Sequence, residues 1–529
     1  MLILSFLLML VVHLSNGANI LIYNPMIGQS HIRFMGNIAD ILSRAGHNLT
    51  VLSVEIDPRL RPFGTTENNI HKIHITMSKD ENVFKELHDN INNVWMDEEM
   101  KAFDPEEFDV FFNPILDGYR VILENKTLID SMKNTKFDLA IHEFYEVGPS
   151  ALMETFEISK TILASAIGDV APYTYQITGV PFMPSFVPGW TTIYDDKMNL
   201  WQRFNNMMKF WEIKGILDKM HDRVLNLFHA HYPEIVDVNQ ILRKKSGLIL
   251  ANVNEFTQTP RPVSSMIQFI GGSSLYPTKP LEKEFDELLN MRKHNVIFSL
   301  GSFVRFCEAP LKIKKLFAQA FASMEDVTFI VKYENCSNDE FDFNKYDNIV
   351  SKAWLPQTDL LGDDRVNAFI THGGMNSITE GQYRGKPMIT IPIFGDQILN
   401  SKNAARVGSA IMIDRRFITN DLLVESLESL LNSQSSFVDK AKFIAKCLDG
   451  REEEYRQRIV KWVELQSGVD EPFDHLAMHS RNLSVLELYN LDILGIVLGI
   501  LLFFIMIIFF VFRLVLITLF NTEEKKKKN

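Results

Sequence analysis

The sequence predicts an α/β protein in which two Rossmann-like domains face a cleft and one C-terminal helix crosses a membrane. Near the amino terminus, an apolar strand at Asn19–Asn24, a helical pattern at His31–Arg44 and a second strand at Leu49–Val54 form one βαβ unit. A second series of strands begins at Val296–Leu300. Ile493–Phe512 is an uncharged apolar run of about 20 residues, long enough to span a hydrocarbon layer.

Length and composition limit the classes of protein to consider. The 529 residues are 46% hydrophobic and 23% charged, which fits two domains of roughly 200 residues and a membrane segment. The net charge of −12 argues against a nucleic-acid partner, because nucleic-acid affinity depends on clustered Lys and Arg. Cys307, Cys336 and Cys447 are too few and too scattered for a disulfide framework or a zinc site, and a single disulfide is left open.

The amino-terminal end is predicted to carry a targeting signal. Met1–Leu14 is apolar and small residues follow up to Gly17, so residues 1–17 are predicted to be a signal peptide, with a core strand as the alternative. The mature chain would then begin with the first strand and enter the secretory pathway. Four Asn-x-Ser/Thr sequons agree with luminal exposure: Asn48, Asn125, Asn335 and Asn482.

The carboxyl-terminal end predicts location and orientation. The basic residues Lys525–Lys528 follow the apolar helix, which places the tail in the cytosol. The last four residues, Lys526–Asn529, are similar to the dilysine retrieval pattern of endoplasmic-reticulum membrane proteins, with a plain stop-transfer anchor as the alternative. We therefore expect a single-pass type I protein of the endoplasmic-reticulum membrane with a luminal body.

The stretch from Trp354 to Asn403 has the pattern of an anion-binding site. Val366–Thr371 has the apolar pattern of a buried parallel strand, and His372–Gly374 turn the chain into a helical pattern at Met375–Tyr383. The first turn of a helix has unpaired N–H groups and the positive end of the helix dipole. A pyrophosphate bound there gains hydrogen bonds and favourable electrostatics together.

Polar side chains surround this helix start at useful spacings. Asn376 and Ser377 lie in the first turn and can add hydrogen-bond donors. Glu380 is one turn further on the same face as Asn376, where a carboxylate can accept from ribose hydroxyls. Upstream, Trp354 offers a flat face for a base, and Gln357 is a polar partner one turn away. Taken singly, Trp354 is equally consistent with a core residue and Asn376 with a helix cap.

The ordered set resembles a known family. Asp396 and Gln397 follow the apolar run Met388–Ile393, at the carboxyl end of a strand, where open α/β sheets bind ligands. With the residues above, they resemble the nucleotide-sugar signature of the UDP-glycosyltransferase family, specifically its membrane-bound, UDP-glucuronosyltransferase-like animal members. The resemblance implies the GT-B architecture, a UDP-sugar as co-substrate and no metal or other cofactor.

The resemblance also implies which residues contact the UDP-sugar. Gly301 and Ser302 turn the first strand of the second domain towards a helix, a place that faces the diphosphate in the family. Glucuronic acid and glucose are both left open as the donor sugar. The implied donor contacts are Trp354 with uracil, Gln357 with the nucleoside, Ser302, His372, Gly374, Asn376 and Ser377 with the diphosphate, Glu380 with the ribose, and Asp396 and Gln397 with the sugar.

His31 and Glu143 are the candidate catalytic residues. His31 follows the first strand at the start of a helix, a position that by itself favours a structural histidine. The resemblance implies that His31 is the general base for an acceptor hydroxyl in an inverting transfer, and that an acidic residue supports it. That residue lies five positions after Asp138, at Glu143, where most members have aspartate. Strand alternation is expected to point the neighbouring His142 to the opposite face.

The resemblance and the linker signals divide the chain. Prolines and glycines cluster between residues 260 and 280, as they do in linkers. We expect an acceptor-binding domain at 18–255, a UDP-sugar-binding domain at 256–450, helices packing back on the first domain at 451–490, the transmembrane helix at 491–514 and a cytosolic tail at 515–529.

The acceptor is expected to be a small lipophilic molecule. Residues 179–190 resemble a family segment near the acceptor site, and residues 200–235 predict helices rich in Trp, Phe and Met. Those helices fit ordinary core packing, an acceptor pocket or a contact with the bilayer, and Met-rich surfaces adapt to varied apolar ligands. A homo-oligomer is left open.

Two other functions compete with sugar transfer. A non-catalytic membrane protein could retain the fold and bind a UDP-sugar or a lipid, although the pair His31 and Glu143 argues for turnover. A dinucleotide-dependent oxidoreductase is disfavoured, because Gly28–His31 stands where a GxGxxG turn would follow the first strand. The sequence therefore favours a UDP-glycosyltransferase.

Overall fold

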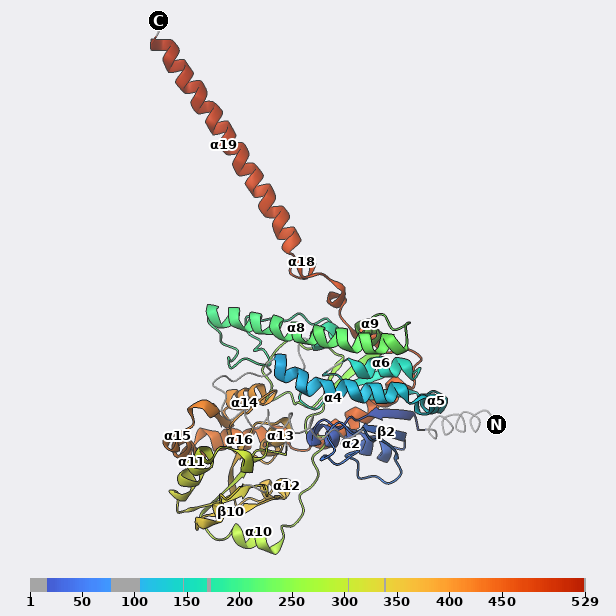
Figure 1. The fold of residues 1–529 in the computed structure, drawn as a ribbon. Helices are drawn as coiled ribbons and strands as arrows, with labels where there is room; N and C mark the ends of the chain where they lie inside the picture. The colour runs from blue at the N-terminus through green and yellow to red at the C-terminus, as the bar shows by residue number, and fades with distance from the viewer. Residues whose placement is uncertain are drawn as a thin grey trace, which may run out of the picture.

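A computed structural model describes residues 17–77, 105–145, 147–168, 173–302, 304–336 and 339–527. It contains two parallel sheets with helices on both faces, and one long helix that projects from the body (Figure 1). The predicted fold class is confirmed. The predicted signal peptide lies, apart from Gly17, outside the described residues.

The first sheet has seven parallel strands that lie in the order β3-β2-β1-β4-β5-β6-β7. Their short apolar sequences are buried almost throughout, as parallel strands covered on both faces must be. The strands are β1 (Asn19–Tyr23), β2 (Asn48–Val54), β3 (His71–Ile75), β4 (Leu139–Glu143), β5 (Thr161–Ser165), β6 (Ser246–Ala251) and β7 (Ile267–Phe269). The helices are α2 (Gln29–Arg44), α4 (Pro105–Glu124), α5 (Lys126–Thr135), α6 (Gly148–Thr155), α7 (Tyr173–Thr178), α8 (Leu200–His231) and α9 (Val238–Lys245).

The second sheet has six parallel strands that lie in the order β10-β9-β8-β11-β12-β13. The strands are β8 (His294–Ser299), β9 (Val327–Lys332), β10 (Ile349–Lys352), β11 (Val366–Thr371), β12 (Met388–Thr390) and β13 (Ala410–Met412). The helices are α10 (Lys283–Leu288), α11 (Leu311–Ala322), α12 (Gln357–Leu361), α13 (Met375–Tyr383), α14 (Gln397–Arg406), α15 (Asn420–Leu431) and α16 (Ser436–Leu448). Short 3₁₀ turns occur at Phe306–Glu308, Phe343–Lys345, Arg415–Phe417, Asp474–Leu476 and His479–Asn482.

The sequence predicts that the first domain ends at residue 255, and one strand of the first sheet lies beyond that residue. Strand β7 pairs with β6, so the first sheet extends to Phe269. This three-residue strand lies among the prolines and glycines that predicted the linker, where a short run has no periodicity to reveal it. Cys307 and Cys336 form a disulfide, while Cys447 is free.

The chain returns to the first domain after completing the second. Helix α17 (Arg451–Ser467) buries Tyr455, Ile459 and Val463 in one apolar cluster with Phe34 and Met35 of α2. It therefore covers the face of the first sheet that α2 also covers. Helices α4, α6, α8 and α9 contribute to the apolar cluster on the opposite face.

The C-terminal helix fits a membrane anchor. After the short helix α18 (Val485–Leu488), helix α19 runs from Leu491 to Lys527 and stands clear of the body (Figure 1). Its segment Leu491–Asn521 contains an 18-residue window with a mean hydropathy of 3.3 and is long and apolar enough to cross a membrane. The helix continues without a break beyond residue 514, the predicted end of the membrane segment.

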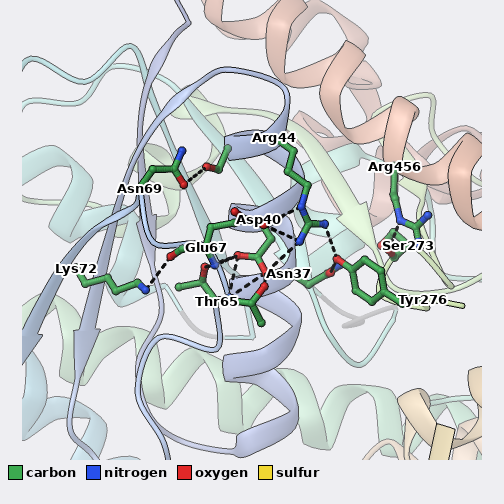
Figure 2. A network of polar contacts seen from close by, with 12 residues as sticks. Asn37, Asp40, Arg44, Thr65, Glu67, Asn69, Lys72, Ser273, Tyr276 and Arg456 are labelled. Carbon is green, nitrogen blue, oxygen red and sulfur yellow. Dashed lines mark hydrogen bonds and ion pairs between the residues drawn. The ribbon is translucent and has the colours of Figure 1, made fainter. Parts of the chain in front are cut away.

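The linker between the sheets is bonded to two helices of the body. The Tyr276 hydroxyl accepts a hydrogen bond from Arg44 Nη1 at 3.0 Å and donates one to Asn37 Oδ1 at 2.7 Å (Figure 2). The Arg456 guanidinium lies over the Tyr276 ring, 5.0 Å from its centre, and Arg456 Nε donates to the Ser273 carbonyl at 3.0 Å. The linker is thereby held against α2 and α17, so these bonds limit how the two sheets are oriented.

We predict that Tyr276→Phe lowers the free energy of unfolding by about 1 kcal/mol, because a partly buried hydrogen bond to Asn37 and an exposed hydrogen bond from Arg44 are lost. Thermal unfolding of the detergent-solubilised chain measures the change. Tyr346→Phe is the matched control, since the structure gives that hydroxyl no hydrogen bond among the described residues. Equal unfolding temperatures for the two variants would contradict the prediction.

Candidate active site

A cavity of about 860 Å³ lies between the two sheets. Its walls come from the loops after β1, β5, β8 and β11 and from α2, α8, α12 and α13. Of the twelve site residues predicted from the sequence, eleven line this cavity. The twelfth, Glu143, is buried behind His31.

His31 and Glu143 are in direct contact. His31 Nδ1 lies 2.7 Å from Glu143 Oε2, and the other carboxylate oxygen accepts the Ala166 N–H at 2.9 Å. Glutamate is one methylene longer than aspartate, and this extra length does not prevent the contact with His31. Because Nδ1 faces the carboxylate, Nδ1 carries the ring proton and Nε2 is the nitrogen left for a ligand. This arrangement leaves the basic nitrogen of His31 available for proton transfer.

Opposing influences act on the pKa of His31. Burial disfavours the imidazolium, but the charge of Glu143, its hydrogen bond and the more distant charge of Asp396 outweigh burial, so the pKa is raised above 6.5. His142, the neighbour that strand alternation points away, has its Nδ1 2.7 Å from the Glu143 carbonyl oxygen. Burial lowers the pKa of His142 to about 4, and the residue does not line the cavity.

The turn after β11 has the glycine geometry that an anion cradle needs. Gly373 has φ +84°, a left-handed conformation that favours glycine. A Cβ on Gly374 would lie 2.4 Å from His372 Nε2, and a Cβ on Gly301 would lie 2.5 Å from His372 Cε1. The two glycines therefore make room for the His372 ring between the β8 and β11 turns. Burial and the charge of Lys332 lower the pKa of His372 to about 4, so it is a neutral hydrogen-bonding group at neutral pH.

The residues at the start of α13 are held by hydrogen bonds. Asn376 Oδ1 accepts from Asn252 Nδ2 of the first domain at 3.1 Å, which links the two sides of the cleft. Gln357 Nε2 donates to Glu380 Oε2 at 2.7 Å and to Ser377 Oγ at 3.3 Å. Burial raises the pKa of Glu380, although its hydrogen bonds and nearby arginines oppose this. These bonds fix the predicted nucleoside and ribose contacts in one cluster.

The Trp354 side chain lines the cleft and is not buried in the core. Its side chain is 58% exposed. The Arg33 guanidinium of α2 lies 5.6 Å from the ring centre, and Lys332 Nζ lies 5.5 Å from it. A flat aromatic face with two cations close to it suits a planar base joined to an anionic group.

The sequence analysis missed Arg33 and Lys332. Lys332 ends β9, where its Nζ donates to the Gly301 carbonyl at 2.5 Å and lies 2.9 Å from Glu334 Oε1. It brings a positive charge to the turn beside His372. Lys332 could have been noticed because it stands at the carboxyl end of a strand. A single lysine, however, has no characteristic spacing from other residues that would mark it as part of the site.

Asp396 and Gln397 lie on the same wall as α13. Asp396 Oδ2 accepts from Asn400 Nδ2 at 2.5 Å, and burial raises the pKa of Asp396 to about 6. Gln397 Oε1 accepts the N–H groups of Ile393 and Phe394 at 2.9 and 3.2 Å. The oxygen of Gln397 therefore holds the backbone turn, and its amide nitrogen is the atom left to contact a ligand.

The predicted absence of a metal stays a prediction. Among the described residues, one cluster of metal-binding residue types comes together, at Cys307, Glu308 and Cys336. Its two sulfurs are bonded to each other in the disulfide, so they do not supply thiolate ligands.

Comparison with known proteins identifies the family. The profile of the family described as UDP-glucoronosyl and UDP-glucosyl transferase matches residues 19–528. The chain belongs to this UDP-glycosyltransferase family. UDP-glucuronosyltransferase 3A1 of Bos taurus is 29% identical to it over 88% of this chain and 88% of the relative. UDP-glucuronosyltransferase 1A7 of Mus musculus is 26% identical over 92% of this chain and 89% of the relative.

Solved structures agree with this membership at the level of the fold. The structure of the glycotransferase of kitacinnamycin is similar with a TM-score of 0.55 at 16% identity, covering 85% of this chain and 99% of that chain. The architecture is thus that of GT-B glycosyltransferases. This UDP-glycosyltransferase is an enzyme that transfers a sugar from a UDP-sugar to an acceptor.

We predict that Trp354→Ala raises the dissociation constant of UDP by about tenfold to hundredfold, because the exposed ring no longer stacks on the base. Isothermal titration of UDP into the detergent-solubilised chain measures the change. Trp201→Ala is the matched control, since Trp201 is similarly exposed and lies outside the cavity. An unchanged dissociation constant for Trp354→Ala would remove Trp354 from the donor site.

Proposed function

We propose that the enzyme transfers glucuronic acid or glucose, with inversion, from the UDP-sugar to a hydroxyl of a small lipophilic acceptor. His31 is the general base and Glu143 supports it. The contact of 2.7 Å between His31 Nδ1 and Glu143 Oε2, on the wall of the cleft opposite α13, is the observation that carries the proposal. The sugar would lie between the His31 ring and the start of α13.

The reaction is a single displacement. His31 Nε2 takes the proton of the acceptor hydroxyl while the hydroxyl oxygen forms a bond to the anomeric carbon. The bond from that carbon to the UDP oxygen breaks, and UDP leaves with the electron pair. The Glu143 carboxylate stabilises the imidazolium that forms, because it lies against the protonated Nδ1. Attack opposite the leaving group inverts the anomeric centre.

The chain's own groups can receive the charge of the leaving UDP. The N–H groups at the start of α13 point along the helix axis at the cavity, and Lys332 adds a positive charge beside them. His372, being neutral, contributes a hydrogen bond rather than a charge. We therefore propose a reaction with the UDP-sugar as co-substrate and no metal or other cofactor.

The chemistry of the acceptor follows from the apolar wall beside His31. The lining on this side comes from α4, α8, the loops after β4 and β5 and the loop before α8. Such a wall favours phenols and lipophilic alcohols or acids over sugars. The apolar lining residues are Phe112, Ile115, Tyr145, Ile167, Trp190, Ile213, Leu217 and Met220.

We also propose the endoplasmic-reticulum membrane as the location, with the body in the lumen and α19 as the single anchor. The dilysine ending supports this, and so do the sequons. All four sequon asparagines are exposed. The Asn125 side chain accepts the Leu128 N–H at 3.0 Å and so begins α5, which makes it the one most restricted as a glycosylation site.

We predict that His31→Ala lowers the turnover number by about 10²–10⁴-fold, because the acceptor hydroxyl loses its base. UDP release with a panel of phenols and several UDP-sugars measures turnover, and mass spectrometry of the products identifies the sugar transferred. The UDP dissociation constant should stay unchanged. His231→Ala, which alters an exposed histidine of α8, is the control. Loss of UDP binding in His31→Ala would contradict the proposal that the first domain supplies the base and the second domain binds the UDP-sugar. Absence of turnover in the wild type would favour a non-catalytic binding protein.

We predict two effects of Glu143→Gln. The pKa of His31 falls, because the raising charge is removed while burial still lowers it. Since the neutral imidazole is the base, kcat/KM rises with pH through this pKa. The half-maximal pH, above 6.5 in the wild type, therefore shifts to lower pH, and the plateau rate falls. A profile of kcat/KM against pH measures both effects, and a wild-type profile would remove Glu143 from the mechanism.

A further inference from the structure

Arg33 brings an arginine of the first domain into the cavity between the two sheets. It lies near the start of α2, two residues after His31. Two residues along a helix turn the side chain by about 200°, so Arg33 and His31 leave α2 in different directions. Both nevertheless line the same cavity. The start of α2 therefore contributes two separate polar side chains to the cavity wall.

The Arg33 side chain reaches the second domain. Its guanidinium carbon lies 5.6 Å from the centre of the Trp354 ring. Its charge also acts on the buried carboxyl of Glu380, where it opposes the rise in pKa that burial causes. Trp354 and Glu380 are the residues implied to hold the uracil and the ribose. The guanidinium is thus close to both parts of the expected nucleoside site.

The N–H groups of Arg33 are available to a ligand. Within the part of the chain that the structure describes, the guanidinium has neither a hydrogen bond nor an ion pair. Arg44, on the same helix, is by contrast bonded to Glu67 and Tyr276. A guanidinium carries five N–H donors in one plane. Arg33 therefore presents a charge and several donors at the cleft, while Arg44 holds the protein's own frame.

We infer that Arg33 is a further donor-binding residue, supplied by the first domain, which contacts the nucleoside that Trp354 and Glu380 hold. A planar guanidinium stacks on a flat base, and its N–H groups donate to the oxygens of the base or the ribose. The inference rests on the proposed donor site, because it needs the nucleoside to lie at Trp354 and Glu380.

This contact couples donor binding to the position of the general base. Arg33 and His31 leave the same helix two residues apart, so a nucleoside held by Arg33 fixes that end of α2 relative to the second domain. The hydrogen bond between Asn252 and Asn376 joins the domains at another point of the cleft. Arg33 therefore adds a contact across the cleft that the donor itself completes.

Titration of UDP and of UMP into the detergent-solubilised full chain tests the contact. Arg33→Met keeps the length of the side chain and removes its charge and its N–H groups. The expected result is a rise of about tenfold in both dissociation constants, because UDP and UMP share the nucleoside. An unchanged dissociation constant for UDP would overturn the inference. So would a rise confined to UDP, because it would assign Arg33 to the diphosphate.

Arg203→Met is the matched control. It removes an exposed arginine of α8 that lies in the first domain and outside the cavity. Its dissociation constants for UDP and UMP are expected to equal those of the wild type. An equal rise in Arg203→Met and Arg33→Met would overturn the inference, because it would show an effect of net charge alone.

A double-mutant cycle tests whether Arg33 and Trp354 act on the same nucleoside. Arg33→Met is combined with Trp354→Ala, and UDP binding is followed by ligand-observed NMR. The expected loss caused by Arg33→Met falls to about threefold or less in the Trp354→Ala background, because the base is no longer held beside the guanidinium. The same tenfold loss in both backgrounds would overturn the inference.

The kinetics separate a donor contact from a merely structural role. Arg33→Met is expected to raise the KM of the UDP-sugar by about tenfold and to leave the KM of the phenol unchanged. An equal rise in both KM values would overturn the inference. If Trp354→Ala weakens UDP binding and Arg33→Met does not, the role of Arg33 fails alone. If neither variant weakens UDP binding, the proposed donor site fails with it.

Discussion

The contact between His31 and Glu143 depends on one feature of the first sheet, the parallel pairing of β1 with β4. This pairing sets Tyr23 opposite His142, so the loop after β1 and the end of β4 emerge together at the carboxyl edge. His31 enters from that loop and Glu143 from that strand end, and the Ala166 N–H after the next strand holds the carboxylate. The loop after β1, the end of β4 and the loop after β5 thus fix the position of the His31 ring. The proposed reaction also needs a sugar to be held opposite this ring.

The second sheet supplies that opposing wall by the same rule. β11 ends at Thr371, and the glycines that follow bring His372 and the start of α13 into the cleft. The two carboxyl edges face each other because the chain between them is fastened at Tyr276 and because α17 returns to the first domain. The hydrogen bond from Asn252 to Asn376 crosses the cleft directly. The fold therefore sets the distance between His31 and the start of α13, the two places that we propose for the proton acceptor and the UDP-sugar.

The sequence predicted those parts of the site that come from one continuous stretch of the chain. The residues from Trp354 to Gln397 lie in one strand, turn and helix series, so their spacing alone predicted that they share a cavity wall. It could not find Arg33 over Trp354, because that contact joins residues of two domains. The strand β7 and the pairing of Cys307 with Cys336 were likewise invisible, since one is too short for periodicity and the other depends on tertiary structure. For α8 the sequence was consistent with core packing, an acceptor pocket or a contact with the bilayer. Only the exposed fractions of its side chains distinguished its two apolar faces.

The central claim is that the first domain's imidazole meets the acceptor while the second domain holds the UDP-sugar. A structure of the full chain with UDP and a bound phenol tests this most directly. The account predicts UDP at the start of α13, and the phenol oxygen within about 3 Å of His31 Nε2. A phenol bound with its oxygen away from His31, while UDP occupies α13, would contradict the account.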